Sequence, residues 1–292
     1  MDKELSIITV DYKSSDFTGN LIADLEKHLT GVSYEIIVVD NDPDGGGAKK
    51  IKKTQRKIKI IKAKENRGFG AGNNLGAKSA KGKYLLFLNP DIKVVDDSIE
   101  KMLDFISKHA EIGALICLLY QRDAKTFQRH FFGRFQNLLT VLLRRQAGRL
   151  PAISDLSSSS LTRGSTNSNF FYSDMVSGAA MMVKREIFER TGGFDENFFM
   201  YFEDEDLCRR LSDSGYKNAV LSTARLIHYE GQSSTSLKKK KFYYKSQNYY
   251  WQKHYGRFLT ILMKILRAPY ILLQILSPPA TRTSCISVPV RR

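Results

Sequence analysis

Short apolar runs alternate with helical patterns over the first 120 residues, and this alternation restricts the possible folds more than any other feature of the chain. Four apolar runs are typical of strands buried on both faces of a parallel sheet, namely Leu5–Val10, Glu35–Val39, Lys57–Ile61 and Tyr84–Leu88. A further apolar strand is expected at Gly113–Leu119. Helical spacing occurs at Thr18–Leu29, Ala71–Ala80 and Ser98–His109. Strands and helices that alternate over short connections predict an α/β fold with a doubly wound, mostly parallel sheet flanked by helices. In such folds, ligands bind beyond the carboxyl ends of the strands.

The second part of the chain is less regular. We expect a basic amphipathic helix at Phe131–Arg145, a polar loop at Ser154–Asn169 and a single apolar strand at Met175–Val183. A short helix at Arg185–Thr191 and one or two strands within Tyr216–Tyr229 are expected to follow.

Length and cysteine content narrow the class of protein. A chain of 292 residues has room for one large α/β domain with an appendage, or for two small domains. The three cysteines, Cys117, Cys208 and Cys285, lie far apart without CxxC spacing. This pattern argues against a disulfide framework or a zinc site and favours a reducing compartment. Residues Met1–Glu4 lead directly into the first strand, so we expect no secretory signal peptide.

The excess positive charge lies largely near the C-terminal end. The net charge is +16, yet no Asp or Glu occurs from Gly231 to Arg292, where Lys and Arg recur. In this tail, the apolar segment Phe258–Ser277 is interrupted by charged residues and a proline. A transmembrane span needs about 20 apolar residues with few charges, so an amphipathic helix lying in a membrane interface suits this segment better. We expect a basic, membrane-associating helical region at residues 236–277 and a disordered tail at residues 278–292.

Four consecutive acids, Glu203–Asp206, stand between an aromatic run and a helical pattern. Like charges side by side repel and are costly to desolvate, so such a cluster suggests a nearby cation or a proton to be removed. A simpler explanation covers part of it, because acids favour the first turn of a helix and form pairs such as Glu205–Arg209 and Asp206–Arg210. Glu203 and Asp204 are left over. A carboxylate against aromatic surface would have a raised pKa, which suits a general base.

A second acidic site, Asn89-Pro90-Asp91, follows the strand Tyr84–Leu88. A carboxylate at the end of a central strand can hold Mg²⁺ or Mn²⁺, which prefer oxygen ligands and bridge to substrate phosphates. The same residues also suit a simple strand end, where proline stops the strand and aspartate caps the next helix. Asp11 and Asp40 likewise follow strands, and acids at three strand ends favour a site at this edge of the sheet.

A glycine-rich turn at Asn66–Asn74 leads into a predicted helix. Gly68 and Gly70 match part of a dinucleotide fingerprint, but Asn73 occupies the third glycine position, and there is no Walker lysine. Two interpretations remain: a turn whose N–H groups and helix N-terminus approach an anion, or a tight turn that needs positive φ.

His228 ends the last predicted strand. A lone histidine at such a position is more often structural. It becomes a ligand if its loop closes over a bound pyrophosphate, where imidazole completes a Mn²⁺ shell.

Taken in order, the motifs resemble those of the family 2 GT-A glycosyltransferases, particularly the bacterial rhamnosyltransferase-like branch that builds surface polysaccharides. The matching segments are Ser6–Ser14, Ile36–Asp42, Glu65–Asn74, Phe87–Asp91, Ser177–Ala180, Gly192–Cys208 and His228–Ser233. The resemblance extends from Ser6 to about Lys253. It implies a GT-A domain at residues 1–235, with a Rossmann-like nucleotide-binding half at 1–120 and an acceptor-binding half at 121–235.

The resemblance also implies roles for individual residues. Asp204 matches the catalytic base, with Glu203 beside it, and Asp91 and His228 match the ligands of Mg²⁺ or Mn²⁺. The implied nucleotide-sugar-binding residues are Val10, Asp11, Asp40, Asn66, Gly68, Asn73, Asn89, Ser177 and Gly178.

Two positions depart from the family pattern. Asn89 replaces the first acid of the DxD metal motif, which removes one anionic ligand. Asp11 replaces an asparagine of the first strand, and a carboxylate near the nucleotide bears on base preference.

The activity implied by the resemblance is inverting transfer of a sugar, with L-rhamnose from dTDP-rhamnose as the branch-level expectation. The acceptor would be a hydroxyl of a lipid-linked or polysaccharide substrate in cell-surface glycan synthesis. A basic tail would then dock the enzyme, peripherally, on the inner face of the cytoplasmic membrane, with each Lys or Arg near an anionic leaflet contributing roughly 1 kcal/mol. The alternative for the helix at Phe258–Ser277 is packing against protein.

Three other functions remain open from the sequence. A basic nucleic-acid-binding protein would use the tail to track phosphates, although the acidic sites would repel a polyanion, so we expect no nucleic-acid partner. A sugar-nucleotide-binding scaffold would keep the fold without catalysis. A nucleotidyltransferase would share the sheet and the metal.

Overall fold

The computed structural model describes residues 4–44, 51, 58–128, 131–138, 141, 169–229 and 237–276. The chain divides into two compact units, one of Met1–Phe135 with Pro151–Ser246 and the other of Gln136–Leu150 with Gln247–Arg292. The predicted domain boundary at residue 235, most of the predicted loop at 154–169 and the predicted tail at 278–292 lie outside the described residues.

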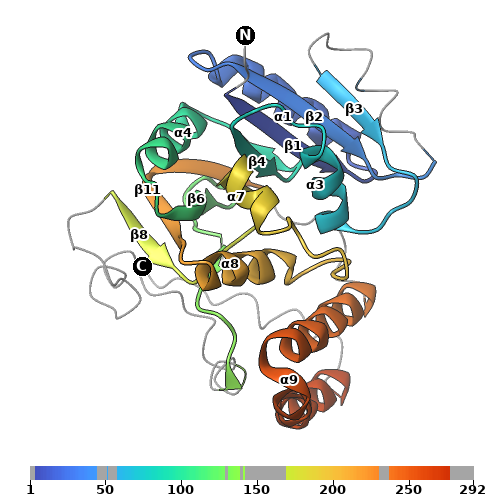
Figure 1. The fold of residues 1–292 in the computed structure, drawn as a ribbon. Coiled ribbons are helices and arrows are strands. Elements are labelled where there is room, and N and C mark those ends of the chain that lie inside the picture. The colour runs from blue at the N-terminus through green and yellow to red at the C-terminus, as the bar shows by residue number, and fades with distance from the viewer. Residues whose placement is uncertain are drawn as a thin grey trace, which may run out of the picture. The chain divides into compact units, whose positions relative to one another are not determined.

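Helices and strands alternate along the first unit as the sequence predicts (Figure 1). The strands are β1 (Leu5–Asp11), β2 (Tyr34–Asp40), β3 (Ile58–Lys62), β4 (Tyr84–Leu88), β5 (Ile92–Lys93), β6 (Ile112–Tyr120), β7 (Phe132–Gly133), β8 (Phe170–Ser173), β9 (Met175–Val176), β10 (Ala180–Lys184) and β11 (Lys217–His228). The helices are α1 (Ser15–His28), α3 (Phe69–Ala77), α4 (Ser98–Lys108), α7 (Arg185–Arg190), α8 (Glu203–Asp213) and α9 (Leu237–Leu276).

One large sheet carries the first unit, with the strand order β3-β2-β1-β4-β10-β6-β11-β5 and with β8 also paired to β11. The strands β3, β2, β1 and β4 are parallel neighbours, and β6 and β11 are parallel as well. Between these two sets, β10 runs antiparallel to both β4 and β6. The predicted α/β class with a mostly parallel central sheet is thereby confirmed.

Burial follows the order of the strands. Every residue of β1 and β4, in the middle of the sheet, is buried. The prediction that the run Lys57–Ile61 is buried on both faces is wrong, because β3 is the edge strand and its residues are exposed or half-buried.

Two further predictions need correction. The run Met175–Val183 is not one strand, because a turn at Gly178 and Ala179 separates β9 from β10. The helix expected to begin at Phe131 does not begin there, because Phe132 and Gly133 form β7 and pair with β9. Residues 142–145 of that predicted helix lie outside the described part of the chain.

Glycines let α3 approach the sheet closely. A Cβ atom at Gly76 would lie 2.5 Å from Cγ2 of Ile8, and one at Gly72 would lie 2.9 Å from Cγ1 of Val10. Since α3 packs on β1 and β2, its N-terminus is brought to the carboxyl ends of these strands.

The helix α9 begins in the first unit and continues into the second. Its backbone is non-helical at Gly256, with φ 79°, and it contains Pro269. Within the second unit, the buried Gln136 accepts a hydrogen bond from Nε2 of Gln247, at 2.8 Å. Among the described residues, no helix is long and apolar enough to cross a bilayer.

We expect Gly76→Ala to lower the free energy of unfolding by about 1–3 kcal/mol, because the new methyl group overlaps Ile8 in a close-packed interface. Gly19→Ala is the matched control, since Gly19 also lies in a helix but has no heavy atom within 4 Å of the position that a Cβ would take. It should stabilise the protein by about 0.5–1 kcal/mol through helix propensity. Urea unfolding measures both values, and equal shifts in the two variants would contradict the packing argument.

Candidate active site

The loop before α8 has an unusual backbone. Tyr201 and Phe202 both have φ of 70°, in the left-handed region that non-glycine residues rarely occupy. Such conformations cost on the order of 1–3 kcal/mol each and persist only where surrounding contacts hold them. Because the loop turns in this way, Glu203 and Asp204 begin the helix.

Asp204 is half-buried and held by two backbone groups. Its Oδ2 accepts a hydrogen bond from the N–H of Gly178 at 3.0 Å, and its Oδ1 accepts one from the N–H of Glu205 at 2.9 Å. Burial raises the pKa of Asp204 above its ordinary value, and these two hydrogen bonds oppose the rise. A partly accessible carboxylate with a raised pKa has the properties of a general base.

Glu203, the residue before Asp204, lies in a different environment. Its side chain is 5% exposed, and its Oε2 has no hydrogen-bond partner among the described residues. Burial, followed by the charge of Asp204, raises the pKa of Glu203 well above its ordinary value. The neutral acid is therefore favoured at Glu203, while Asp204 is the carboxylate supported by donors.

Another acid of the quartet, Asp206, forms a structural pair with Arg210. Asp206 is fully buried and accepts a hydrogen bond from Nε of Arg210 at 2.8 Å, which confirms the expected pair. Arg210 also donates to the carbonyl oxygens of Thr191 and Gly193, each at 2.7 Å. This arginine, which no sequence motif assigned to the site, fixes α8 against the turn that follows α7.

Asp91 and His228 meet because β5 pairs with the end of β11. Nε2 of His228 lies 3.0 Å from Oδ1 of Asp91 and 3.4 Å from Nδ2 of Asn89. On the other side of the ring, Nδ1 of His228 lies 2.7 Å from Oε1 of Gln128. The structure thus brings together three residues that the sequence motifs selected and adds Gln128, which no local motif indicated.

The donor set suits a divalent cation. If Nδ1–H of the neutral ring donates to Gln128, then the lone pair of Nε2 faces a carboxylate oxygen of Asp91. Two electron-rich atoms in contact are stabilised by a proton or by a cation that both can bind. Carboxylate and imidazole are ligands of Mn²⁺, and Mg²⁺ is commonly held by one or two carboxylates together with substrate phosphates. In the part of the chain that the structure describes, no group of three or more His, Cys, Asp or Glu side chains gathers as a complete cage.

The turn between β9 and β10 connects the two acidic sites. Gly178 donates its N–H to Asp204, and the next residue, Ala179, accepts a hydrogen bond from the N–H of Asn89 at 2.9 Å. The hydroxyl of Ser177 accepts from the N–H of Ala179 within the same turn. Asp204 and the Asn89–Asp91 segment are therefore attached to adjacent residues of one turn.

Asp40 and Asp11 lie side by side in the register of β1 and β2. Both are fully buried, and Oδ2 of Asp40 has no hydrogen-bond partner among the described residues. Asp11, in contrast, accepts hydrogen bonds from the hydroxyl of Thr18 and the N–H of Ser14. Burial raises the pKa of Asp11. Its two hydrogen bonds tie β1 to the start of α1.

The remaining predicted nucleotide-binding residues lie around the N-terminus of α3. Oδ1 of Asn66 accepts hydrogen bonds from Gly68 N–H and from Nδ2 of Asn41. Gly68 has φ of 100°, and a Cβ there would lie 2.0 Å from the carbonyl oxygen of Phe199. Asn73 is buried and donates to a carbonyl within α3, and Val10 packs under the same helix, as described above. The roles predicted for these residues in donor binding stay predictions.

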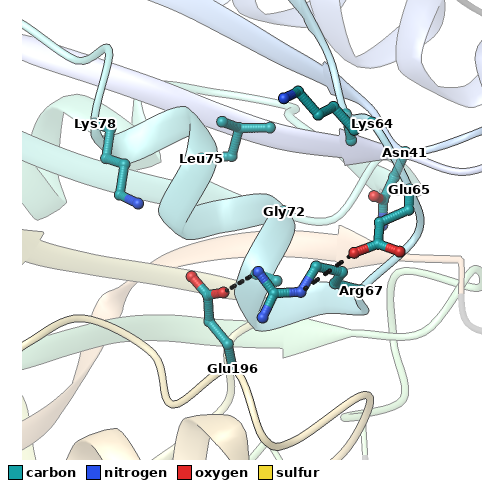
Figure 2. A pocket seen from close by; sticks show the side chains of 10 residues that line it. Asn41, Lys64, Glu65, Arg67, Gly72, Leu75, Lys78 and Glu196 are labelled. Carbon is teal, nitrogen blue, oxygen red and sulfur yellow. Dashed lines mark ion pairs between the residues drawn. The ribbon is translucent and has the colours of Figure 1, made fainter.

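A pocket of about 230 Å³ opens beside α3, beyond the ends of β2 and β3. It is lined by Asn41, Ala63, Lys64, Glu65, Arg67, Ala71, Gly72, Leu75, Lys78 and Glu196. Figure 2 shows Arg67 between Glu65 and Glu196; its Nη1 lies 2.9 Å from Oε2 of Glu196. Neither Asp204 nor the Asn89–Asp91 segment lines this pocket, so the position of the pocket alone does not mark where the chemistry occurs.

Comparison with known proteins gives a consistent set of relatives. A sequence model of glycosyl transferase family 2 matches residues 6–192, and one described as the N-terminal domain of galactosyltransferase matches residues 160–233. Rhamnosyltransferase WbbL of Escherichia coli K12 is 28% identical over 247 residues, which cover 81% of this chain and 87% of that protein. The N-acetylglucosaminyl-diphospho-decaprenol L-rhamnosyltransferase of Mycobacterium tuberculosis is 23% identical over 247 residues, which cover 80% of this chain and 78% of that protein.

Solved structures resemble the fold at low sequence identity. The crystal structure of GalNAc-T7 with UDP, GalNAc and Mn²⁺ has a TM-score of 0.59 at 14% identity and covers 97% of this chain. That of TarS from S. aureus has a TM-score of 0.53 at 15% identity and covers 87% of this chain. The chain matches 58% and 44% of the lengths of these two solved chains. The likeness confirms the GT-A fold class.

We expect Glu203→Gln to flatten the dependence of stability on pH. The Glu203 carboxyl binds its proton more tightly in the folded protein than in the unfolded chain, where its pKa is near 4.5. The stability from this group is therefore complete below the unfolded pKa and is lost as pH rises toward the raised folded pKa. The amide does not titrate, so Tm should fall less above pH 4.5 in the variant than in the wild type.

Glu186→Gln is the control, because that side chain is 86% exposed, and its Tm curve should run parallel to the wild-type curve. Parallel curves for Glu203→Gln and the wild type would contradict the assignment of a neutral buried acid.

Proposed function

We propose that this chain, which belongs to glycosyl transferase family 2, is an inverting glycosyltransferase. It transfers a sugar from a nucleoside diphosphate to an acceptor hydroxyl. Its rhamnosyltransferase-like relatives support a role in glycan synthesis. The observation that carries the proposal is the attachment of Asp204 and of the Asn89–Asp91 segment to adjacent residues of one turn. A base and a diphosphate-binding group need such a fixed separation, because an inverting displacement requires attack opposite the leaving group.

Asp204 is assigned as the general base. It takes the proton from the acceptor hydroxyl while the hydroxyl oxygen forms a bond to the anomeric carbon. The bond from that carbon to the donor phosphate breaks, and its electron pair leaves with the nucleoside diphosphate. The transition state has oxocarbenium character, as in glycoside hydrolysis. Gly178 and Glu205 hold the carboxylate, and their N–H groups favour its charged form before reaction.

Asp91 and His228 are assigned as the residues that hold Mg²⁺ or Mn²⁺, with Asn89 beside them. A bound divalent cation offsets the negative charge that grows on the leaving diphosphate. Gln128 orients the His228 ring so that Nε2 faces Asp91. Second-sphere partners of this kind set the tautomer of a ligating histidine.

The donor's nucleotide is assigned to the edge formed by β1, β2 and α3. The buried Oδ2 of Asp40 lacks a partner among the described residues, and a base or ribose group that donates a hydrogen bond would satisfy it. The names of two relatives support L-rhamnose as the sugar moved, and dTDP-rhamnose is proposed as its donor. The name of the mycobacterial relative supports a lipid-linked diphosphate sugar as acceptor.

We expect Asp204→Asn to reduce the rate of transfer by on the order of 10²–10⁴-fold, because the amide cannot accept the proton. Binding of the donor diphosphate should be unchanged in this variant.

Asp91→Ala should instead abolish the part of UDP, GDP or dTDP binding that depends on Mn²⁺, as measured by calorimetry. Asp213→Asn, at the exposed end of α8, is the matched control for loss of a carboxylate.

Two results would count against the proposal. Transfer that survives in Asp204→Asn would reject the base assignment. Binding of random oligonucleotides, without binding of any nucleoside diphosphate, would favour the nucleic-acid alternative.

The proposal includes docking of the chain to the inner face of the cytoplasmic membrane. Three large apolar side chains of α9, Phe258, Ile261 and Ile265, are 79%, 50% and 63% exposed and recur at the spacing of one helix face. No acid occurs from Gly231 onwards, so anionic lipid headgroups complement the charge of this segment. An apolar stripe on a basic helix is typical of helices that lie in a membrane interface.

We expect Phe258→Glu to weaken binding to vesicles containing phosphatidylserine by about tenfold or more, because burial of one such side chain is worth about 1.5–3 kcal/mol. Tyr12→Glu makes the same kind of change at an exposed aromatic residue just after β1 and should leave vesicle binding unchanged. Co-sedimentation measures both. Equal binding by the two variants would contradict docking through this stripe. A concentration-dependent dimer that Phe258→Glu dissociates would show that the stripe contacts protein.

A further inference from the structure

The loop that carries Asp204 is held on one side by the glycine-rich turn. The carbonyl oxygen of Phe199 accepts a hydrogen bond from the N–H of Phe69 at 3.0 Å. Gly68 leaves room for this contact, because a side chain there would collide with the backbone of Phe199. Gly70 lies beside the first residue of α8, since a Cβ there would be 3.6 Å from Cβ of Glu203, an ordinary van der Waals distance. The hydrogen bond from Phe69 therefore fixes the start of the loop at Phe199.

The first three turns of α9 hold the same loop through different contacts. The rings of Phe242 and Phe199 stack, with centroids 4.6 Å apart and planes inclined by 24°. The ring of Tyr243 lies 5.2 Å from that of Phe202 and 5.8 Å from that of Tyr201. Ser246 is buried, and its hydroxyl donates to the carbonyl oxygen of Met200 at 2.8 Å.

These contacts reach every residue of the loop from Phe199 to Phe202, including the two with left-handed backbone. A loop in that conformation relaxes when the contacts that hold it are removed. Relaxation at Phe202 would move Asp204, two residues later, away from the N–H of Gly178. The aromatic and hydroxyl contacts therefore act on the position of the carboxylate and not only on the packing of α9.

We propose that Phe242, Tyr243 and Ser246 form a clasp that positions Asp204 for proton transfer. The inference rests on the proposed role of Asp204 as general base. The clasp lies outside residues 6–192 and 160–233, the segments that the family models match. It belongs to the same compact unit as the loop, because that unit extends to Ser246. A segment that reads in sequence as the start of a basic tail is thus part of the catalytic apparatus.

The test compares Phe242→Ala and Ser246→Ala with Lys245→Ala in the full-length protein. Lys245 is exposed on the same helix turn and serves as the matched control. We expect Phe242→Ala to lower kcat by roughly 10–100-fold, as misplacement of a reacting group does. The KM for the donor and the affinity for its diphosphate should stay within about twofold. Phe242→Tyr, which keeps a ring for the stack with Phe199, should restore kcat.

A pH profile separates positioning from packing. Burial and the Gly178 hydrogen bond shift the pKa of Asp204 in opposite directions, so a displaced carboxylate should move the acidic limb of the kcat profile. Should Phe242→Ala fold poorly, Ser246→Ala removes only one hydroxyl and gives the same readout. A lower Tm with unchanged kcat and an unchanged acidic limb in both variants would overturn the clasp.

Asp204→Asn is included in the same series. Inactive Asp204→Asn beside fully active Phe242→Ala and Ser246→Ala would overturn the clasp and leave the base assignment intact. Active Asp204→Asn would overturn the base assignment, and the clasp with it.

Discussion

The antiparallel insertion of β10 is the constraint on which the rest of the site depends. Because β10 runs against β4, Ala180 at the start of one strand faces Leu88 at the end of the other. The turn that precedes β10 is therefore delivered to the carboxyl edge of a sheet whose N-terminal strands are all parallel. There the turn bonds Asn89 on one side and Asp204 on the other. An all-parallel sheet would have placed this turn at the opposite edge, away from both acids.

The two adjacent carboxyl groups, Glu203 and Asp204, have different surroundings. Glu203 is buried without a donor on Oε2 among the described residues, whereas Asp204 is half-buried and receives two N–H groups. Burial raises the pKa of both groups, and the charge of Asp204 adds to the rise at Glu203, whereas the two N–H groups oppose the rise at Asp204. Surroundings that separate the pKa values of two adjacent carboxyl groups are a means of assigning acid and base roles.

Local patterns predicted much of the fold, because buried strands and amphipathic helices are recorded in short stretches of sequence. The strands β1, β2, β4 and β6 and the helices α1 and α4 lie within a few residues of their expected bounds. The errors occurred where long-range pairing decides the outcome. Ser177–Ala180 lies within an apolar run that resembles one strand, but Gly178 and Ala179 form a turn that is bonded to Asp204 and Asn89. Edge position likewise decides the exposure of β3, and no local signal carries that information.

The candidate site shows the same division. Asp91 and His228 were selected by their motifs, yet their contact depends on the pairing of β5 with β11. Gln128 has no motif, and its role follows only from its distance to the His228 ring.

The tail is the clearest case, because composition separates it from the body at about residue 231, where acids cease. The contacts of Phe242 and Ser246 with the loop before α8 put the boundary of the functional unit later. The charge pattern and the packing contacts therefore divide the chain at different residues. Acids cease at about residue 231, whereas the aromatic groups of the same segment pack on a loop with left-handed backbone in the first unit.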